Sequence, residues 1–435
     1  MSSALPWGVA TRESMRILFI AAKPPDPPLR GYQLRAHHQL RLLGRRHRVT
    51  LLCFGGSKDA PADDVAAAPL CEETIVVPYR AAGMAAGLCG VLAGRPLQTA
   101  MYETPAMRRA VGRLLAERRH DLVHVQLARM AGCVEETAGL PRVIDLVDAL
   151  SLNFQRRSGY DRAPFGIAAR LEARRLRRYE RKICRTWDHA TVVSPVDRGA
   201  IGDFANLTVN RSGIELDDCG WRTGERDPHT IVFTGNLGYF SNADAICWFV
   251  REIFPLITRE EPRARLLVVG ARAGRKVRGL AARDRRIVVE GFVQRPQAYL
   301  ERCGLAIAPM RAGSGQLFKV MEAMACGAPL VATRLAAAGI AAESERHFLA
   351  AETPPVFARQ VLRLMREPAL GSRLGAEARR LLAARYGWEQ SVSELEEIYR
   401  AVIERRCGRA ANQAPSQAGD FDDTWPDNLP ADFSG

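Results

Sequence analysis

Residues 15–22, Met-Arg-Ile-Leu-Phe-Ile-Ala-Ala, decide the fold class, because this short apolar run is typical of a strand buried in a parallel sheet. A proline-rich loop follows and ends at Gly31, and residues 49–54 form a second apolar run. Between them, side chains recur at helical spacing at Leu34, His38, Leu42 and Leu43. Strand, glycine-bearing loop, helix and strand make a βαβ unit, which favours a doubly wound α/β sheet.

The same rhythm continues along the chain and predicts two tandem Rossmann-like domains. The first covers residues 15–207, with further strands at 74–78, 122–126, 143–147 and 190–193. Residues 208–228 mix polar residues, glycines and charges and are predicted to be a linker. Such tandem domains place two rows of strand carboxyl ends on either side of a cleft, which is where ligands bind.

The second domain is predicted over residues 229–385. Its elements alternate as strand 230–234, helix 243–257, strands 265–269 and 286–289, helix 296–302, strand 305–308, helix 316–326 and strand 329–332. Helices then dominate residues 355–405, interrupted at 386–388, and we expect 386–405 to cross back to the first domain. The tail 412–435 has five Asp, no Lys or Arg and no periodicity, so it is predicted to be disordered.

The formal net charge of +14 comes from 62 Lys plus Arg against 48 Asp plus Glu. It divides into +19 over residues 1–411 and −5 over the tail, and only five of the cations are lysines. This imbalance indicates a compositional preference for Arg. Because the cations are scattered over both domains and no nucleic-acid motif appears, we expect no nucleic-acid partner.

The ten cysteines include no Cys-x-x-Cys pair, and no His stands at metal-ligand spacing. They are interpreted as reduced thiols of a cytoplasmic protein. No apolar stretch is long enough to span a membrane, and the first apolar run is too short for a signal peptide. Residues 1–14 are weakly patterned, and Met15 is a possible start of translation. The one Asp-x-Asp, at residues 420–422, is interpreted as part of a solvated tail rather than a metal site.

The strongest functional candidate is the segment 309–333, between two predicted strands. Gly313 and Gly315 allow close backbone approach, and the free N–H groups of the helix start offer a cradle for a diphosphate. Lys319 would neutralise phosphate charge, and Glu322, on the same helix face, would accept from vicinal hydroxyls such as those of a ribose. The alternative is a surface ion pair on an ordinary helix. Lysine is informative here because this chain uses Arg for nearly every other cation.

Over about residues 15–405 the chain resembles the retaining glycosyltransferases of family 4, which have the two-domain GT-B fold, and specifically the group found in exosortase-linked exopolysaccharide gene clusters. The motifs that carry this resemblance, in order, are Pro24-Pro25 with Gly31 and Arg35, Gly94-Arg-Pro-Leu97, Asp145-Leu-Val-Asp148, Thr191-Val-Val-Ser194, Phe233-Thr-Gly235 with Asn242-Ala-Asp244, Val268-Val-Gly270, Gly291-Phe-Val293, the segment 313–333 and Arg385-Tyr-Gly-Trp388.

This resemblance implies transfer of a sugar from a nucleotide-diphosphate donor, bound mainly by the second domain, to an acceptor held by the first. Glu322 would grip the ribose, and Lys319 would face the diphosphate, as the catalytic pair. No cofactor or divalent metal is implied. The implied donor-binding residues are Gly31, Arg35, Gly235, Gly270, Arg272, Arg311, Gly313, Ser314, Gly315, Gln316, Leu317, Lys319 and Glu322. On the acceptor side are His124, Gln126 and Asp148.

The sequence departs from the family pattern at four places. Ser314 stands where many members have a Glu, eight residues before Glu322, and Leu317 stands where this subtype often has Arg. Residues 235–242 lack the Arg and Lys that commonly clamp the diphosphate. A sugar-contacting His of the family would fall at Gln126, with His124 two residues earlier. His124 is also interpretable as a packed histidine at a strand end.

Eight of the sixteen residues 170–185 are Lys or Arg, beside an apolar stripe. The cluster is either a solvated helix face or a surface for anionic lipid headgroups, on the inner face of the cytoplasmic membrane. The apolar, glycine-rich segment 81–94 would dip into that interface or pack internally. The expected acceptor is accordingly polyprenyl-diphosphate-linked or a polysaccharide, during exopolysaccharide assembly.

Two other functions remain open. An epimerase of the same fold acting on a nucleotide sugar would need acid and base groups in the cleft, and no convincing carboxylate or His cluster is apparent. A catalytically weak scaffold or binding protein is suggested by Ser314 and by the missing cation pair in residues 235–242.

Overall fold

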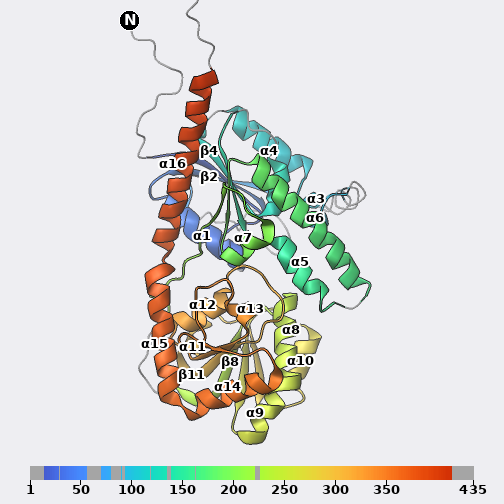
Figure 1. Cartoon of the computed structure of the whole chain (residues 1–435). Coiled ribbons are helices and arrows are strands. Elements are labelled where there is room, and N and C mark those ends of the chain that lie inside the picture. Colours follow the sequence, from blue (N-terminus) through green and yellow to red (C-terminus); the bar gives the residue numbers. More distant parts are fainter. Residues whose placement is uncertain are drawn as a thin grey trace, which may run out of the picture.

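The protein is described by a computed structural model that covers residues 14–28, 30–55, 70–79, 90, 94–117, 119–134, 139–161, 163–220 and 226–413. It has two α/β domains, one above the other in Figure 1, each built around its own parallel sheet. The fold class is therefore the expected one. Our interpretations of residues 1–13, of most of the apolar segment 81–94 and of the acidic tail beyond residue 413 concern parts of the chain outside the described residues.

The first domain holds a seven-stranded sheet in the order β3-β2-β1-β4-β5-β6-β7, with every neighbouring pair parallel. The strands are β1 (Arg16–Ala21), β2 (Arg48–Gly55), β3 (Glu73–Pro78), β4 (Leu122–Gln126), β5 (Arg142–Val147), β6 (His189–Val192) and β7 (Leu207–Val209). The apolar residues of β1 are fully buried because helices cover both faces of the sheet. The predicted apolar strands of this domain are confirmed within two residues at their ends.

The helices of the first domain begin where the sequence provides caps. Thr104 accepts from the backbone N–H of Met107, and Ser194 accepts from that of Asp197, each just before a proline at the helix start. The helices are α1 (Gly31–Leu43), α3 (Leu97–Ala100), α4 (Pro105–Ala116), the 3₁₀ helix η2 (Ala128–Cys133), α5 (Leu150–Ser158), α6 (Phe165–Thr186) and α7 (Pro195–Ile201).

The second domain holds a six-stranded parallel sheet in the order β10-β9-β8-β11-β12-β13. Its strands are β8 (Asp227–Thr234), β9 (Arg265–Val269), β10 (Ile287–Gly291), β11 (Cys303–Ala308), β12 (Leu330–Ala332) and β13 (Leu349–Ala350). Its helices are α8 (Phe240–Trp248), the π-helix η3 (Phe249–Ile253), α9 (Phe254–Glu260), α10 (Arg275–Ala281), α11 (Gln297–Arg302), α12 (Phe318–Ala325), α13 (Arg334–Ala337), α14 (Pro354–Arg366) and α15 (Pro368–Arg385).

Some elements differ from the sequence prediction. The single helix expected over residues 243–257 is divided by η3, because Pro255 has no N–H to donate and the turn before it widens. The segment predicted as a linker, 208–228, contains the end of β7 and the start of β8. The helix expected at 316–326 begins only at Phe318, after an extended Leu317.

The last helix, α16 (Trp388–Gln413), leaves the second domain and packs against the first, along the left edge of Figure 1. Trp388, Leu395 and Tyr399 are buried in one apolar cluster with Phe19 of β1 and Leu40 of α1. The core of the first domain therefore includes residues of α16.

The chain crosses between the domains twice, and the two crossings lie side by side. Nδ2 of Asn210 donates to the carbonyl of Ser391 (2.8 Å), and the N–H of Ile214 donates to the carbonyl of Tyr386 (2.8 Å). A Cβ atom on Gly213 would lie 2.5 Å from the nitrogen of Trp388, so this contact requires glycine.

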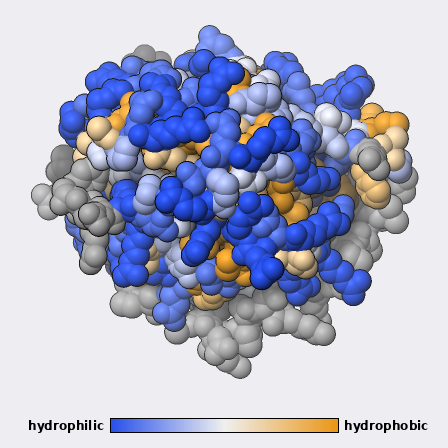
Figure 2. All heavy atoms as spheres, turned by 90° about the horizontal axis from the view of Figure 1, so that it is seen from below, coloured by the Kyte–Doolittle hydropathy of each residue, from blue (hydrophilic) through white to orange (hydrophobic). Residues whose placement is uncertain are grey.

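The surface seen from below, at the far end of the second domain, is covered mainly by hydrophilic residues with apolar residues scattered among them (Figure 2). Among the described residues, no helix combines the length and the apolar character needed to cross a membrane.

Candidate functional site

The strand order of each sheet reverses at one point, between β1 and β4 in the first domain and between β8 and β11 in the second. In doubly wound sheets, ligands bind outside the strand carboxyl ends at this point. The starts of α1 and α12 meet there, since a Cβ atom on Gly31 would lie 3.0 Å from Cδ2 of Phe318. The candidate site is therefore formed by loops of both domains.

Residues 313–317, the glycine loop, hydrogen-bond to the first domain. The Arg156 guanidinium donates to the carbonyl of Gly313 (2.5 Å), and the Ser314 hydroxyl donates to the Asp148 carboxylate. The N–H of Gly315 donates to Asp197 (3.3 Å). Gly313 and Gly315 both have positive φ (140° and 70°), which glycine adopts without strain. The structure thus brings four predicted loop residues, Gly313, Ser314, Gly315 and Gln316, to the domain boundary.

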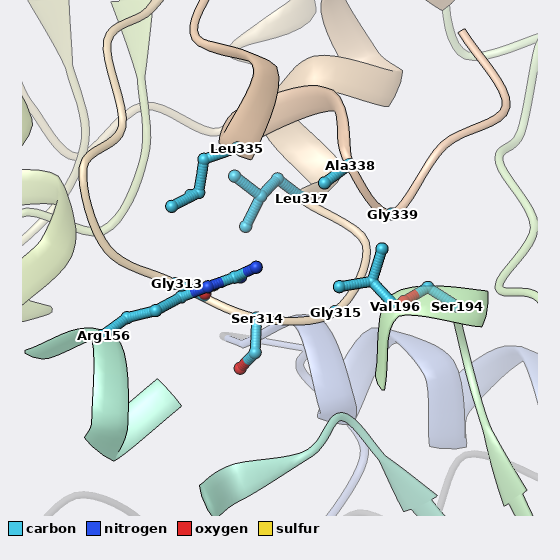
Figure 3. Close-up of a pocket in the computed structure, with 10 residues that line it drawn as sticks. All are labelled: Arg156, Ser194, Val196, Gly313, Ser314, Gly315, Leu317, Leu335, Ala338 and Gly339. Carbon is cyan, nitrogen blue, oxygen red and sulfur yellow. The ribbon is translucent and has the colours of Figure 1, made fainter. Parts of the chain in front are cut away.

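A narrow hollow lies beside this loop (Figure 3). Arg156 extends into it from α5, while Leu317 and Leu335 face it from the second domain. The remaining lining residues are Ser194, Val196, Gly313, Ser314, Gly315, Ala338 and Gly339. The hollow combines apolar walls with one cation, and burial lowers the pKa of Arg156 from its usual value.

Lys319 lies in the first turn of α12, against the second sheet. Its Nζ donates to Oδ1 of Asn242 and lies 4.3 Å from the centroid of the Phe233 ring. A Cβ atom on Gly235 would lie 2.8 Å from this nitrogen, so the loop after β8 can pass over Lys319 only with glycine there. Burial lowers the pKa of Lys319 to about 7, partly offset by the nearby Glu322.

Glu322 lies one turn further along α12. Burial raises the pKa of its carboxyl group to about 7, and Lys319 opposes that shift. Among the described residues, no group donates a hydrogen bond to this carboxylate, so both oxygens are available to a ligand. Two partly buried groups of opposite charge, each with its pKa near neutrality, thus share one face of the helix.

The other second-domain candidates lie around the ends of β8 and β9. A Cβ atom on Gly270 would lie 1.8 Å from the carbonyl oxygen of Gly235, so this close approach excludes any side chain at 270. Arg272 adopts a positive φ of 62° and packs beside the turn at Gly238. Arg311 makes a two-point ion pair with Asp244 (2.6 and 3.0 Å), and these contacts hold its guanidinium against α8.

Arg35, which the family resemblance places at the donor, is fully buried. Its guanidinium donates to Asp145 (2.6 Å), Asn210 (2.7 Å) and Ser212 (3.2 Å). These contacts tie α1 to β5 and to the first crossing between the domains. Arg35 is therefore a positioning residue under the site and does not face a ligand in this arrangement.

His124 is also fully buried, stacked on Phe19 with ring centroids 4.4 Å apart and hydrogen-bonded to the Tyr399 hydroxyl through Nδ1 (2.8 Å). Burial lowers the pKa of His124 to about 4, so the ring is neutral at pH 7. This environment agrees with the interpretation of His124 as a packed histidine at the end of a strand. Gln126 lies two residues further and donates to the carbonyl of Tyr32 (3.1 Å), which fixes the start of α1.

Asp148 and Asp197 form a pair of carboxylates facing the glycine loop. Burial and the neighbouring Asp197 raise the pKa of Asp148 to about 6, and burial raises the pKa of Asp197. Asp197 also accepts from the N–H of Ala149 (3.0 Å). Sequence reasoning named Asp148 but missed Asp197, because the spacing Ser194-Pro-Val-Asp197 is that of a helix cap. It also missed Arg156, one arginine among many.

Comparison with known proteins supports the fold of the two domains. Residues 228–367 match the family model described as "Glycosyl transferases group 1". A search of the curated proteins finds no match. Among solved structures, sucrose-phosphate synthase from Thermosynechococcus elongatus is similar with a TM-score of 0.70 at 16% identity, covering 90% of this chain and 100% of that one.

Two further structures are similar over nearly their whole length. Anabaena Alr3699/HepE in complex with UDP has a TM-score of 0.62 at 14% identity, covering 89% of this chain and all of that one. TarM from S. aureus, in complex with fondaparinux, α-GlcNAc-glycerol and UDP, has a TM-score of 0.64 at 11% identity, covering 88% and 100%. Residues 228–367 are therefore similar to the group 1 glycosyltransferases, within a chain that has the two-domain GT-B fold.

Proposed function

We propose that this protein transfers a glycosyl unit from a nucleoside-diphosphate sugar to a hydroxyl group of a glycan or lipid-linked acceptor, with retention of configuration. The observation that carries this proposal is the pair Lys319 and Glu322, one turn apart at the start of α12 and beside the glycine loop. The group 1 domain over residues 228–367 supports the reaction class. The UDP complexes of HepE and TarM support a nucleotide as part of the donor.

The chemical roles follow from charge and geometry. The bond between the anomeric carbon and the diphosphate oxygen breaks, and negative charge develops on the departing diphosphate. Lys319 and the N–H groups at the start of α12 would stabilise that charge. Glu322, whose carboxylate has no hydrogen-bond donor among the described residues, would accept from the two ribose hydroxyls. The acceptor oxygen, approaching from the first-domain side where Asp148 and Asp197 lie, would bond to the anomeric carbon on the face that the diphosphate leaves, as retention requires. Its proton would pass to the departing diphosphate oxygen.

The test is transfer and donor hydrolysis by purified protein on a panel of nucleotide sugars, comparing the wild type with Lys319→Ala and Glu322→Ala. Each loses one charge-assisted contact to the donor, so UDP or GDP affinity in a calorimetric titration falls roughly 10- to 100-fold. Arg380→Ala, on the exposed face of α15, is the control. Full activity in both α12 variants would show that this is not the site.

We further propose that the reaction needs no divalent metal. Lys319 and the backbone N–H groups then carry the whole charge of the diphosphate. In the part of the chain that the structure describes, no three His, Cys, Asp or Glu residues gather in a way that could hold a metal ion. Turnover that is unchanged by a chelator is the expected outcome, and restoration of a chelated enzyme by Mg²⁺ or Mn²⁺ would contradict it.

A binding protein of the same fold is the second candidate, favoured by Ser314 and by the absence of a cation in residues 235–242. Nucleotide binding without turnover on any acceptor would support it. We place the enzyme in exopolysaccharide assembly, in the cytoplasm and at the inner face of the membrane that carries a lipid-linked acceptor. Loss of the polymer in a strain with Lys319→Ala tests that role.

A further inference from the structure

Helices α5 and α6 form a hairpin at the outer edge of the first domain (Figure 1). The turn that joins them, around residues 159–164, lies beside the second domain, because Tyr160 packs 4.9 Å from the guanidinium carbon of Arg311. The hairpin therefore has an inner helix that contacts the donor-binding domain and a long outer helix whose far side faces solvent.

The first turns of α6 expose large apolar side chains. Phe165 is 69% exposed, Ile167 62% and Leu171 49%. Ile167 and Leu171 are four residues apart, so they lie on one stripe of the helix. Among the described residues few large apolar side chains are this exposed, and here three occur within seven residues. Such a cluster indicates a surface that is covered by something.

The remainder of the same face is basic. Continuing the stripe at helical spacing, Arg174 and Arg178 follow Leu171. The two acidic residues of α6 point inward, where Glu172 accepts from the N–H of Gln98 (3.0 Å) and Glu180 accepts from Ser151. No described carboxylate forms an ion pair with the cations of the outer face, which are Arg170, Arg174, Arg175, Arg177, Arg178, Lys182 and Arg185. This face therefore presents positive charge alone.

The charges decide what covers the apolar residues. A second copy of this chain would bring cations against cations, which opposes self-association of this face. An anionic lipid surface matches both the positive charge and the apolar residues of α6. Its headgroup phosphates attract the arginines, and its interface accepts the apolar side chains. We propose that the outer face of α6 docks on an anionic membrane, with Ile167 and Leu171 entering the interface and the cations on the headgroups.

This inference rests on the proposed function and identifies the surface of the protein that contacts the membrane. It also places the donor site close to the membrane, because α5 connects the two. Asn153 donates to the Tyr239 hydroxyl (2.8 Å), Arg156 donates to Gly313, and the Arg157 guanidinium carbon lies 5.0 Å from the ring centroid of Phe240. A lipid-linked acceptor at α6 is thus one helix away from the glycine loop.

The experiment is flotation of the full chain with vesicles of phosphatidylcholine alone or with about 30% phosphatidylglycerol. The wild type is expected to float only with the anionic vesicles, and less so as salt rises. The double variants Ile167→Ser/Leu171→Ser and Arg174→Glu/Arg178→Glu are each expected to lower binding roughly tenfold or more. Val288→Ser and Arg380→Glu are matched exposed controls in the second domain and keep full binding.

Three results would overturn the proposal. They are absence of lipid-dependent flotation by the wild type, undiminished binding by both double variants, or a concentration-dependent dimer in sedimentation that the apolar variant abolishes. Thermal unfolding confirms that each variant is folded. Flotation needs no catalysis, and Lys319→Ala is expected to bind vesicles like the wild type, so failure of the docking surface and failure of the proposed enzyme activity give different results.

Discussion

At the scale of the residue, Lys319 and Glu322 are each in an environment that opposes their own charge. Burial disfavours the ammonium and the carboxylate alike, and their mutual attraction favours the charged pair. A diphosphate would add a negative partner for Lys319, and a ribose diol would add donors for Glu322. Ligand binding therefore changes the protonation of the pair, and donor affinity must depend on pH near neutrality.

We expect donor affinity to be greatest near pH 7. The pKa of Lys319, lowered to about 7, means that the cation is present below that pH and lost as pH rises through it. The pKa of Glu322, raised to about 7, means that the carboxylate is present above that pH and lost as pH falls through it. Calorimetric titration with UDP from pH 5.5 to 8.5 checks this bell shape.

Two variants test the acidic and the alkaline side of this pH profile of donor affinity separately. Lys319→Arg keeps a charge at every pH used, so affinity no longer falls on the alkaline side. Glu322→Gln has no carboxylate to protonate, so the acidic fall disappears. A flat profile in the wild type would contradict this account of the site.

Glu180 offers a separate prediction about stability. Burial raises the pKa of its carboxyl group to about 7, so the folded state favours the neutral form. Ionisation of Glu180 therefore lowers the stability of the folded state. This loss begins as pH rises above the pKa of the unfolded chain, near 4.5, and it is complete above the pKa of the folded protein, about 7. Glu180→Gln keeps a carbonyl oxygen for the N–H of Ser151 and removes the charge.

The variant is expected to be more stable than the wild type at pH 8, by on the order of 2 to 3 kcal/mol, and nearly unchanged at pH 5. Thermal unfolding at the two pH values measures this difference. Glu397→Gln, on the exposed side of α16, controls for removal of a surface carboxylate. A variant that is less stable at pH 8 would show that Glu180 is stabilised as an anion.

At the scale of the element, the backbone of the glycine loop packs directly against the backbone of Gly339, just after α13. A Cβ atom on Gly339 would lie 2.3 Å from the carbonyl oxygen of Gly315, a backbone atom that cannot rotate away. We expect Gly339→Ala to push the glycine loop from its position against Asp148 and Asp197. Donor affinity then falls several-fold and the unfolding temperature drops.

Gly279→Ala is the matched control for that substitution. Gly279 lies within α10, where an added Cβ atom meets nothing within 4 Å. This change leaves donor affinity unaltered and stabilises the helix by up to about 1 kcal/mol. Calorimetric titration with UDP and thermal unfolding measure both variants, and equal affinities would show that the loop tolerates displacement.

Sequence alone identified most strands because strands buried in a parallel sheet form continuous apolar runs, as in β1 and β9. It missed β7 and β13, which have three and two residues and carry no such run. The failures at the site have a different cause. Arg35 and His124 are of residue types that bind ligands, but their partners Asp145 and Tyr399 lie 110 and 275 residues away. Only the three-dimensional structure shows that these groups form hydrogen bonds with one another.

At the scale of the whole molecule, the Trp388 ring joins the two domains. It stacks on His38 of the first domain, with centroids 4.5 Å apart, and lies 6.4 Å from Phe318 of the second. The two crossings of the chain run beside this ring, at Gly213 and at Tyr386. The two domains are therefore joined at this edge both by the chain itself and by the packing of the Trp388 ring.

Trp388→Ala should uncouple the domains. The cavity left by a buried indole costs roughly 3 to 5 kcal/mol, and the loss falls on the contact between domains. We expect differential scanning calorimetry to show two separate transitions in place of one cooperative event. Phe292→Ala, which removes an exposed ring, is the control and leaves the thermogram unchanged. A single transition at lower temperature would assign Trp388 to the first domain alone.

The path of α16 also has a consequence for synthesis on the ribosome. The core of the second domain is complete once Tyr386 has been made, whereas the cluster around Phe19 in β1 waits for Tyr399 and Val402. The domain translated first is thus the last to be finished. Until α16 emerges, the nascent chain exposes the apolar surface that this helix will cover, and exposed apolar surface of this kind favours aggregation.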